Sequence, residues 1–95
     1  MPWAQRLRSL HTWWVSRVSG KTDQGKLLHG LGTTIRAQRK ALGFSQEAFA
    51  DAAEIDRSHM GKIERGERNV TLLNLIRSAQ ALDRTASQIL ADAGL

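Results

Sequence analysis

The sequence has no cysteine and no long apolar run. Without cysteine, disulfide bonds, thiol nucleophiles and thiolate zinc sites are excluded. No apolar segment approaches the roughly 20 residues that a membrane-spanning helix needs. A chain of 95 residues with 41% hydrophobic side chains can bury one core but not two. We therefore expect a soluble, cytoplasmic protein with one globular domain held together by packing alone.

Acidic side chains are scarce in the first third of the chain. Residues 1–30 contain five basic side chains and one acidic one, whereas residues 31–95 contain nine and eight. The formal net charge of +5 favours an anionic partner, either nucleic acid or a membrane surface. A polar stretch over 20–26, followed by Gly30 and Gly32, predicts a boundary near residue 30. This divides the chain into a basic, tryptophan-containing tail with a linker, and one domain.

Beyond residue 30 the patterns are helical, and strand patterns are absent. Capping residues and glycines divide this region into five short helices. They run from about 34 to 42, from the cap Ser45 over 46–53, from the cap Asp56 to Gly66, from the cap Thr71 to Leu82, and from the cap Thr85 to Ala93. The expected apolar stripes are Leu31, Ile35 and Leu42 on the first helix, and Leu72, Leu75, Ile76, Ala79 and Leu82 on the fourth. The fold class is therefore all-α, a compact five-helix domain.

The second and third of these helices form a helix-turn-helix. Only Glu54 and Ile55 join them, so the two helices must cross steeply. On a helical wheel of the third helix, Met60 and Ile63 share one side. The opposite side carries Arg57, Ser58, Gly61, Lys62 and Arg65. A helix in the major groove of DNA needs this division into an apolar anchor and a polar arc that contacts base edges.

Arg39 lies in the middle of the apolar stripe of the first helix, four residues after Ile35. A buried arginine needs a carboxylate partner, and Glu64 lies between the polar and apolar sides of the third helix. We predict a bidentate Arg39–Glu64 ion pair that fixes the angle of the third helix. Gly61 leaves two interpretations open. Its missing side chain lets the helix approach the floor of the groove, or it relieves crowding.

The stretch SQEAFADAAEIDRSHMGKIERG over 45–66, preceded by Arg39 and followed by a leucine-rich helix, resembles the Cro/CI (XRE) family of helix-turn-helix domains. The resemblance covers residues 31–95. It implies a lambda-repressor-like five-helix fold that binds operator DNA as a dimer and regulates transcription. The settings of such regulators include phage, plasmid, restriction-modification and toxin–antitoxin systems. The sequence departs from the family at Glu54, where a glycine with positive φ is usual.

The resemblance also assigns roles to individual side chains. Base edges of double-stranded DNA would be contacted by Arg57, Ser58 and Lys62. The DNA backbone would be contacted by Ser45, Gln46, Arg65, Arg68 and Asn69.

No cofactor, metal or enzymatic activity is expected. Glu47, Asp51 and Glu54 fit a solvated helix face better than a metal site. The histidines at 11, 29 and 59 have no nucleophile or carboxylate at a catalytic spacing, and we expect all three to be solvent-exposed.

The tail has its own pattern. An amphipathic basic helix is predicted over 3–18, with Trp3, Leu7, Leu10, Trp14 and Val18 in one arc. Four interpretations stay open for it: packing on the domain or on a dimer mate, a translation start placed too far upstream, a membrane-surface anchor, and contacts to DNA phosphates.

A homodimer is expected through residues 85–95, because Ile89, Leu90 and Leu95 would be exposed apolar side chains near the end of the sequence. In the other interpretation they complete the core of the monomer. The predicted function is sequence-specific, major-groove DNA binding by the helix over 56–65, on a palindromic operator. The alternative function is an antitoxin or adaptor that mainly binds a protein partner, for instance a toxin.

Overall fold

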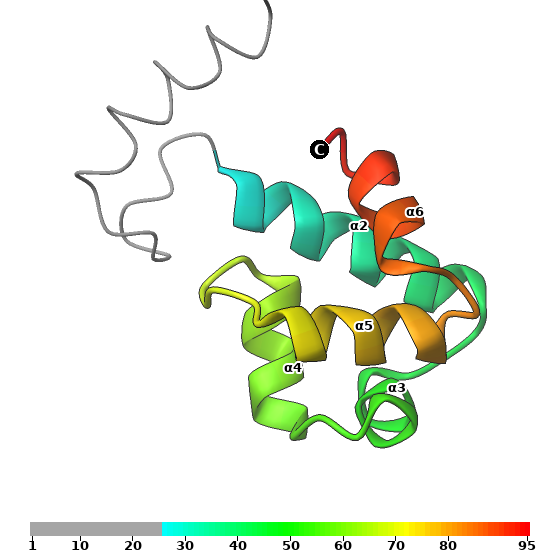
Figure 1. Cartoon of the computed structure of the whole chain (residues 1–95). Coiled ribbons are helices and arrows are strands. Elements are labelled where there is room, and N and C mark those ends of the chain that lie inside the picture. Colours follow the sequence, from blue (N-terminus) through cyan, green and yellow to red (C-terminus); the bar gives the residue numbers. More distant parts are fainter. Residues whose placement is uncertain (1–25) are drawn as a thin grey trace, which may run out of the picture.

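The computed structural model describes residues 26–95, which form five helices (Figure 1). They are α2 (Leu27–Ala41), α3 (Gln46–Ala53), α4 (Arg57–Glu64), α5 (Leu72–Ala81) and α6 (Ala86–Asp92). This part of the chain contains no strand, so the all-α, five-helix class is confirmed. None of its helices is long and apolar enough to cross a membrane. The amphipathic helix predicted over 3–18 lies outside the described residues.

Side-chain caps start four of the five helices, as the sequence predicts. The hydroxyl groups of Ser45 and Thr71 accept the backbone N–H of Ala48 and Asn74, at 3.0 and 3.1 Å. The Asp56 carboxylate accepts the backbone N–H groups of Ser58 and His59 at the start of α4. Thr85 and Gln88 form a reciprocal capping box at the start of α6. These local hydrogen bonds explain why the sequence places the starts of α3 to α6 well.

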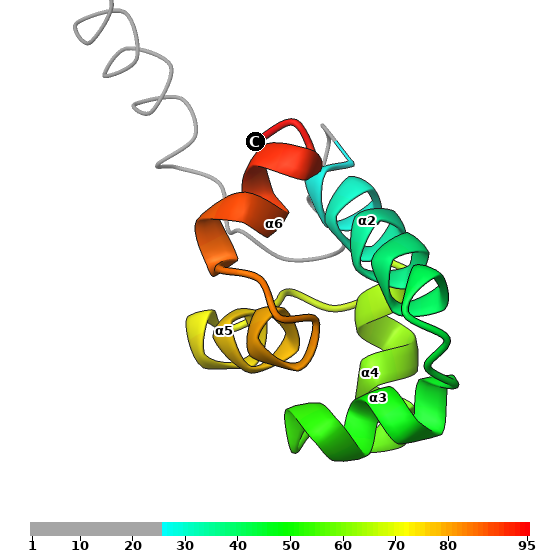
Figure 2. The same cartoon turned by 90° about the vertical axis from the view of Figure 1, so that its right-hand side faces the viewer.

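One apolar core joins the five helices. Its fully buried members include Ile35 of α2, Phe49 of α3, Met60 and Ile63 of α4, Ala79 of α5 and Ile89 of α6. Helix α3 packs on α4 and α5, while α2 packs on α4 and α6. The two views together place α3 and α4 at one end of the domain, away from α6 (Figures 1 and 2). The core therefore holds the helix-turn-helix against α2 and α5.

Helix α2 begins at Leu27, so the predicted start near Thr34 is wrong. The cap residue Lys26 makes no side-chain capping hydrogen bond, which leaves no sequence signal for the start. Gly32, one of the two glycines that predicted a boundary, lies inside the helix. A Cβ at this position would stand 2.3 Å from the Ile63 carbonyl oxygen, too close for any side chain. Gly32 thus allows α2 to cross closely over the end of α4. The boundary expected at residue 30 also falls inside this helix.

Three apolar side chains differ from their predicted environment. Leu42, expected in the buried stripe of the first helix, is the C-cap of α2 and lies exposed. Leu72, at the first position of α5, is also exposed, because the buried side of that helix begins at Leu75. Ile89, expected on an exposed dimer surface, is fully buried in the core, while Leu95 is exposed. The exposed apolar surface over 85–95 is therefore smaller than the sequence predicts.

Candidate nucleic-acid interface

The turn between α3 and α4 has the geometry of a helix-turn-helix, although it lacks the usual glycine. Glu54 adopts the left-handed conformation, with φ 58° and ψ 40°. The backbone N–H of the next residue, Ile55, donates to the Ala50 carbonyl oxygen at 2.9 Å, and the Ile55 side chain is buried. In Figure 1, α3 is seen almost along its axis while α4 runs across the view, so the two helices cross steeply.

Helix α4 has a buried side and an exposed side, as the helical wheel predicts. Met60 and Ile63 are fully buried in the core. Arg57 and Ser58 are exposed at the beginning of the helix, and Lys62 is half-buried one turn later. The three residues predicted to contact base edges thus lie away from the core, at the solvent side of α4.

The structure contains the ion pair that the sequence predicts between α2 and α4. Arg39 Nε donates to Glu64 Oε2 at 2.7 Å, and Arg39 Nη2 donates to Glu64 Oε1 at 2.9 Å. Arg39 Nη1 also donates to the Phe44 carbonyl oxygen at 2.9 Å. Arg39 and Glu64 are only 7% and 4% exposed, so the charges are desolvated but paired. The pair ties the end of α4 to α2.

A third side chain extends this buried network to the surface. Gln46 Nε2, at the start of α3, donates to Glu64 Oε1 at 3.2 Å. The amide of Gln46, predicted to contact the DNA backbone, is thereby oriented by the same carboxylate that holds Arg39. The start of α3, the end of α4 and the last turn of α2 thus share one hydrogen-bond network.

Gly61, predicted on the exposed arc of α4, is buried beneath two side chains. A Cβ at this position would stand 3.0 Å from Arg65 Nη1 and 3.4 Å from Gln46 Oε1. The missing side chain therefore makes room for Arg65 and Gln46, which supports the second interpretation, relief of crowding. The close contacts at this position come from the side chains of Arg65 and Gln46 and not from the core.

Two of the predicted base-contacting residues have neighbours on the exposed face. Arg57 Nη1 lies 3.8 Å from Glu47 Oε2, and both side chains are 68% exposed, so the attraction is weak and the guanidinium stays accessible. The Ser58 hydroxyl donates to the Asp56 carboxylate. This hydrogen bond, with the backbone N–H of His59, lowers the pKa of Asp56 below its usual value. Asp56 therefore caps α4 and also holds the Ser58 hydroxyl on the exposed side of the helix.

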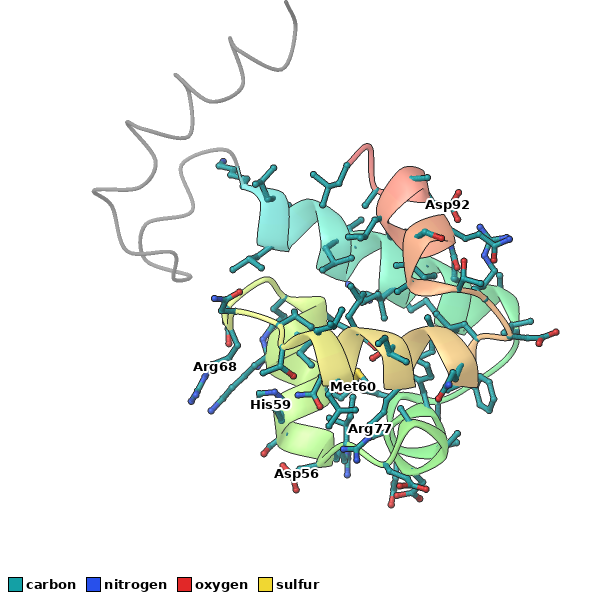
Figure 3. The ribbon with its side chains drawn as sticks, in the orientation of Figure 1. Asp56, His59, Met60, Arg68, Arg77 and Asp92 are labelled. Atoms are coloured by element: carbon teal, nitrogen blue, oxygen red, sulfur yellow. The ribbon has the colours of Figure 1, made fainter. Side chains whose placement is uncertain are left out.

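The loop after α4 carries the remaining predicted contacts. Arg65 Nε donates to Glu67 Oε1 at 2.9 Å, and Arg65 Nη2 donates to Glu67 Oε2 at 3.2 Å. These hydrogen bonds lower the pKa of Glu67. Arg68 and Asn69 are exposed, and Figure 3 shows Arg68 extending outward from the loop. Ser45 is exposed at the start of α3, where its hydroxyl caps the helix.

His59 does not lie free in solvent, contrary to the prediction. It is half-buried, and its Nε2 atom lies 3.2 Å from Asn74 Nδ2 of α5. The contact joins α4 to the helix behind it. His59 and Asn74 are 15 positions apart in the sequence, so the helical pattern of α4 alone could not predict this contact. Within residues 26–95, no group of three or more His, Cys, Asp or Glu residues could hold a metal ion.

The steeply crossing α3 and α4, the short turn and the exposed polar face of α4 define a helix-turn-helix domain of the kind found in DNA-binding regulators of transcription. A family described as helix-turn-helix, HTH_3, matches residues 35–89. The chain belongs to this family, as the resemblance to Cro/CI (XRE) domains predicts. The family is one of DNA-binding regulators.

Two control proteins and a biofilm regulator are similar to this chain over most of the length that the structure describes. The control protein C.SmaI of Serratia marcescens is 38% identical over 65 residues, which cover 68% of this chain and 77% of that protein. The restriction-modification controller protein C.AhdI of Aeromonas hydrophila is 42% identical, with a TM-score of 0.64 over 65% of this chain and 94% of that one. The biofilm regulator SinR, solved in complex with DNA, is 28% identical, with a TM-score of 0.60 over 63% and 97% of the two chains.

Proposed function

We propose that the chain is a sequence-specific transcriptional regulator that inserts α4 into the major groove of its operator. Arg57, Ser58 and Lys62 contact base edges there. The observation that carries this proposal is the orientation of α4. The buried Arg39–Glu64 pair and the Met60 and Ile63 side chains fix one side of the helix in the domain, which leaves the other side to the groove.

Phosphate contacts on both sides of the groove position the domain. Ser45 and Gln46 at the start of α3, with Arg68 and Asn69 in the loop after α4, supply side-chain or backbone donors for them. Polar groups at a helix N-terminus suit a phosphate because the exposed backbone N–H groups and the helix dipole favour negative charge. With nine basic and eight acidic side chains over 31–95, affinity depends on the placement of these donors and not on net charge.

The operator is proposed to be palindromic and to bind two copies of the chain. Two recognition helices would then occupy half-sites about 34 Å apart, one turn of B-DNA. The half-buried Leu90 and the exposed Leu95 supply apolar surface at the end of α6 for the contact between copies. Light scattering at tens of micromolar tests this step, and a monomer both with and without operator DNA contradicts it.

The similarity to C.SmaI and C.AhdI supports a narrower role as a control protein of a restriction-modification system. None of the relatives reported above is described as an antitoxin, and nothing in residues 26–95 favours a toxin or a membrane surface as partner. The regulator is therefore the only function proposed.

Selection of bound fragments from random double-stranded DNA tests the proposal. The full-length chain should enrich one palindromic motif whose half-sites are one helical turn apart. Arg68→Ala should keep this motif, lower affinity for all sequences alike, and reduce the slope of log affinity against log salt by about one. Failure of the unmodified chain to enrich any motif would overturn the proposed function.

A further inference from the structure

We propose that Arg65 contacts the edge of a guanine in the major groove, and that Glu67 is the positioning residue that aims its guanidinium. This inference rests on the proposed function and replaces the phosphate contact predicted for Arg65. It adds a specificity-determining residue to Arg57, Ser58 and Lys62. Three observations carry it: where the guanidinium lies, which of its donors remain free, and the charge of Glu67.

The guanidinium of Arg65 lies along the DNA-facing side of α4. Arg65 follows Gly61 by four residues and Ser58 by seven, so all three share one face of the helix. Its Nη1 atom is 3.0 Å from the position of a Cβ at Gly61. The side chain thus turns back toward the beginning of α4, the part of a recognition helix that contacts base edges. A Cβ at position 61 would force the guanidinium to move by a few tenths of an ångström, so the glycine suits this path.

The donors left free by Glu67 match a guanine. A guanidinium has five N–H donors, and Glu67 accepts the Nε–H and one Nη2–H, at 2.9 and 3.2 Å. One Nη2–H and both Nη1–H groups remain. The two adjacent N–H groups at the end of the guanidinium fit the N7 and O6 acceptors of guanine, which is the commonest specific contact of arginine with DNA. Glu67 therefore occupies one edge of the guanidinium and leaves the other for a base.

Glu67 is a costly residue on a DNA-facing loop unless it has such a role. Its pKa is lowered by the hydrogen bonds from Arg65, so it is a carboxylate at neutral pH and repels phosphates. Arg65 and Glu67 side chains are 57% and 52% exposed, and ion pairs this exposed contribute little to folding. The pair therefore gives little to the fold and can be altered without unfolding the domain.

Selection from random DNA with variants of the full-length chain distinguishes a guanine contact of Arg65 from a phosphate contact. Arg65→Ala should lose a guanine at one position of each half-site. Affinity for the original site should fall about 5- to 150-fold, the equivalent of one bidentate contact, with little change on random DNA. Arg65→Lys should not restore the guanine, because an ammonium lacks two N–H groups in fixed geometry. The matched control is Arg68→Ala, which should keep the motif.

Removal of Glu67 tests the positioning role. If Glu67 only repels DNA, Glu67→Ala raises affinity for the original site and for random DNA by the same factor, and the inference is wrong. The inference predicts a rise on random DNA alone, a lower ratio of specific to random affinity, and a weaker preference for the same guanine. Thermal melting of Glu67→Ala should equal that of the unmodified chain.

Gly61→Ala provides an independent check. Its methyl group should shift the Arg65 guanidinium by a few tenths of an ångström and weaken the same guanine preference, by less than Arg65→Ala does, although every side chain on this face is kept. A motif that survives Arg65→Ala intact overturns this inference alone. A chain that enriches no motif before any substitution overturns the proposed function, and this inference with it.

Discussion

The two sides of α4 each carry an arginine–glutamate pair, and the environments of the two pairs are opposite. On the inner side, the Arg39 and Glu64 side chains are 8% and 2% exposed. On the outer side, the Arg65 and Glu67 side chains are 57% and 52% exposed. Both pairs make two hydrogen bonds of ordinary length. Where water is excluded, removal of one partner leaves an unpaired buried charge, whereas the exposed pair contributes little to the fold and remains available to a ligand.

The largest difference between the pairs should be in stability. Glu64→Ala leaves the Arg39 charge buried without a carboxylate, and we expect the free energy of unfolding to fall by roughly 3 to 5 kcal/mol. Urea unfolding followed by circular dichroism measures the change. Glu67→Ala is the matched control on the outer side and should leave the unfolding midpoint unchanged. Similar losses for both variants would show that burial does not distinguish the pairs.

A smaller effect is expected at the turn that sets which side of α4 faces outward. Glu54 pays about 1 to 2 kcal/mol for its left-handed conformation. A glycine relieves this cost, but it loses about 0.5 to 1 kcal/mol more conformational entropy on folding. Glu54→Gly should therefore stabilise the domain by up to about 1.5 kcal/mol. A loss of stability on thermal unfolding would mean that the Glu54 side chain has a role that its contacts do not reveal.

The smallest effect concerns pH and the start of α4. Asp56 has a lowered pKa in the folded chain because the Ser58 hydroxyl and the His59 N–H donate to its carboxylate. A lowered folded-state pKa contributes stability above the ordinary value of 3.8, and this stability is lost as pH falls through the folded-state pKa. Asp56→Asn should therefore make stability less dependent on pH below about 4. Unfolding midpoints at pH 3 and pH 6 measure this, and an unchanged pH dependence would contradict it.

The elements that the sequence predicted well are those with local signals. Ser45, Asp56, Thr71 and Thr85 cap their helices through bonds to residues two or three positions away, so α3 to α6 begin where expected. The start of α2 has no such cap. Its Gly32 is explained by the distant Ile63 and Glu64 carbonyl groups, which no local pattern contains. Close packing between helices thus accounts for the largest error in the fold.

In the candidate site, too, the sequence predicted the features that have a local signal and missed those that depend on contacts between elements. The helical wheel placed Met60 and Ile63 inside and Arg57 and Ser58 outside, because these positions depend only on the period of one helix. It could not show that Arg65 and Gln46 cover Gly61, because Gln46 comes from α3 and the path of a long side chain has no period. The Arg65–Glu67 pair was missed for a similar reason, since the loop after α4 is not helical.

The outer side of α4 is proposed to distinguish one DNA sequence from another. The most direct test is the affinity of Arg57→Ala for the selected operator and for random DNA of the same length and salt concentration. We predict a loss of roughly 1 to 3 kcal/mol on the operator and little change on random DNA. An equal loss on both would contradict the claim, because Arg57 would then act only as a positive charge near the phosphates.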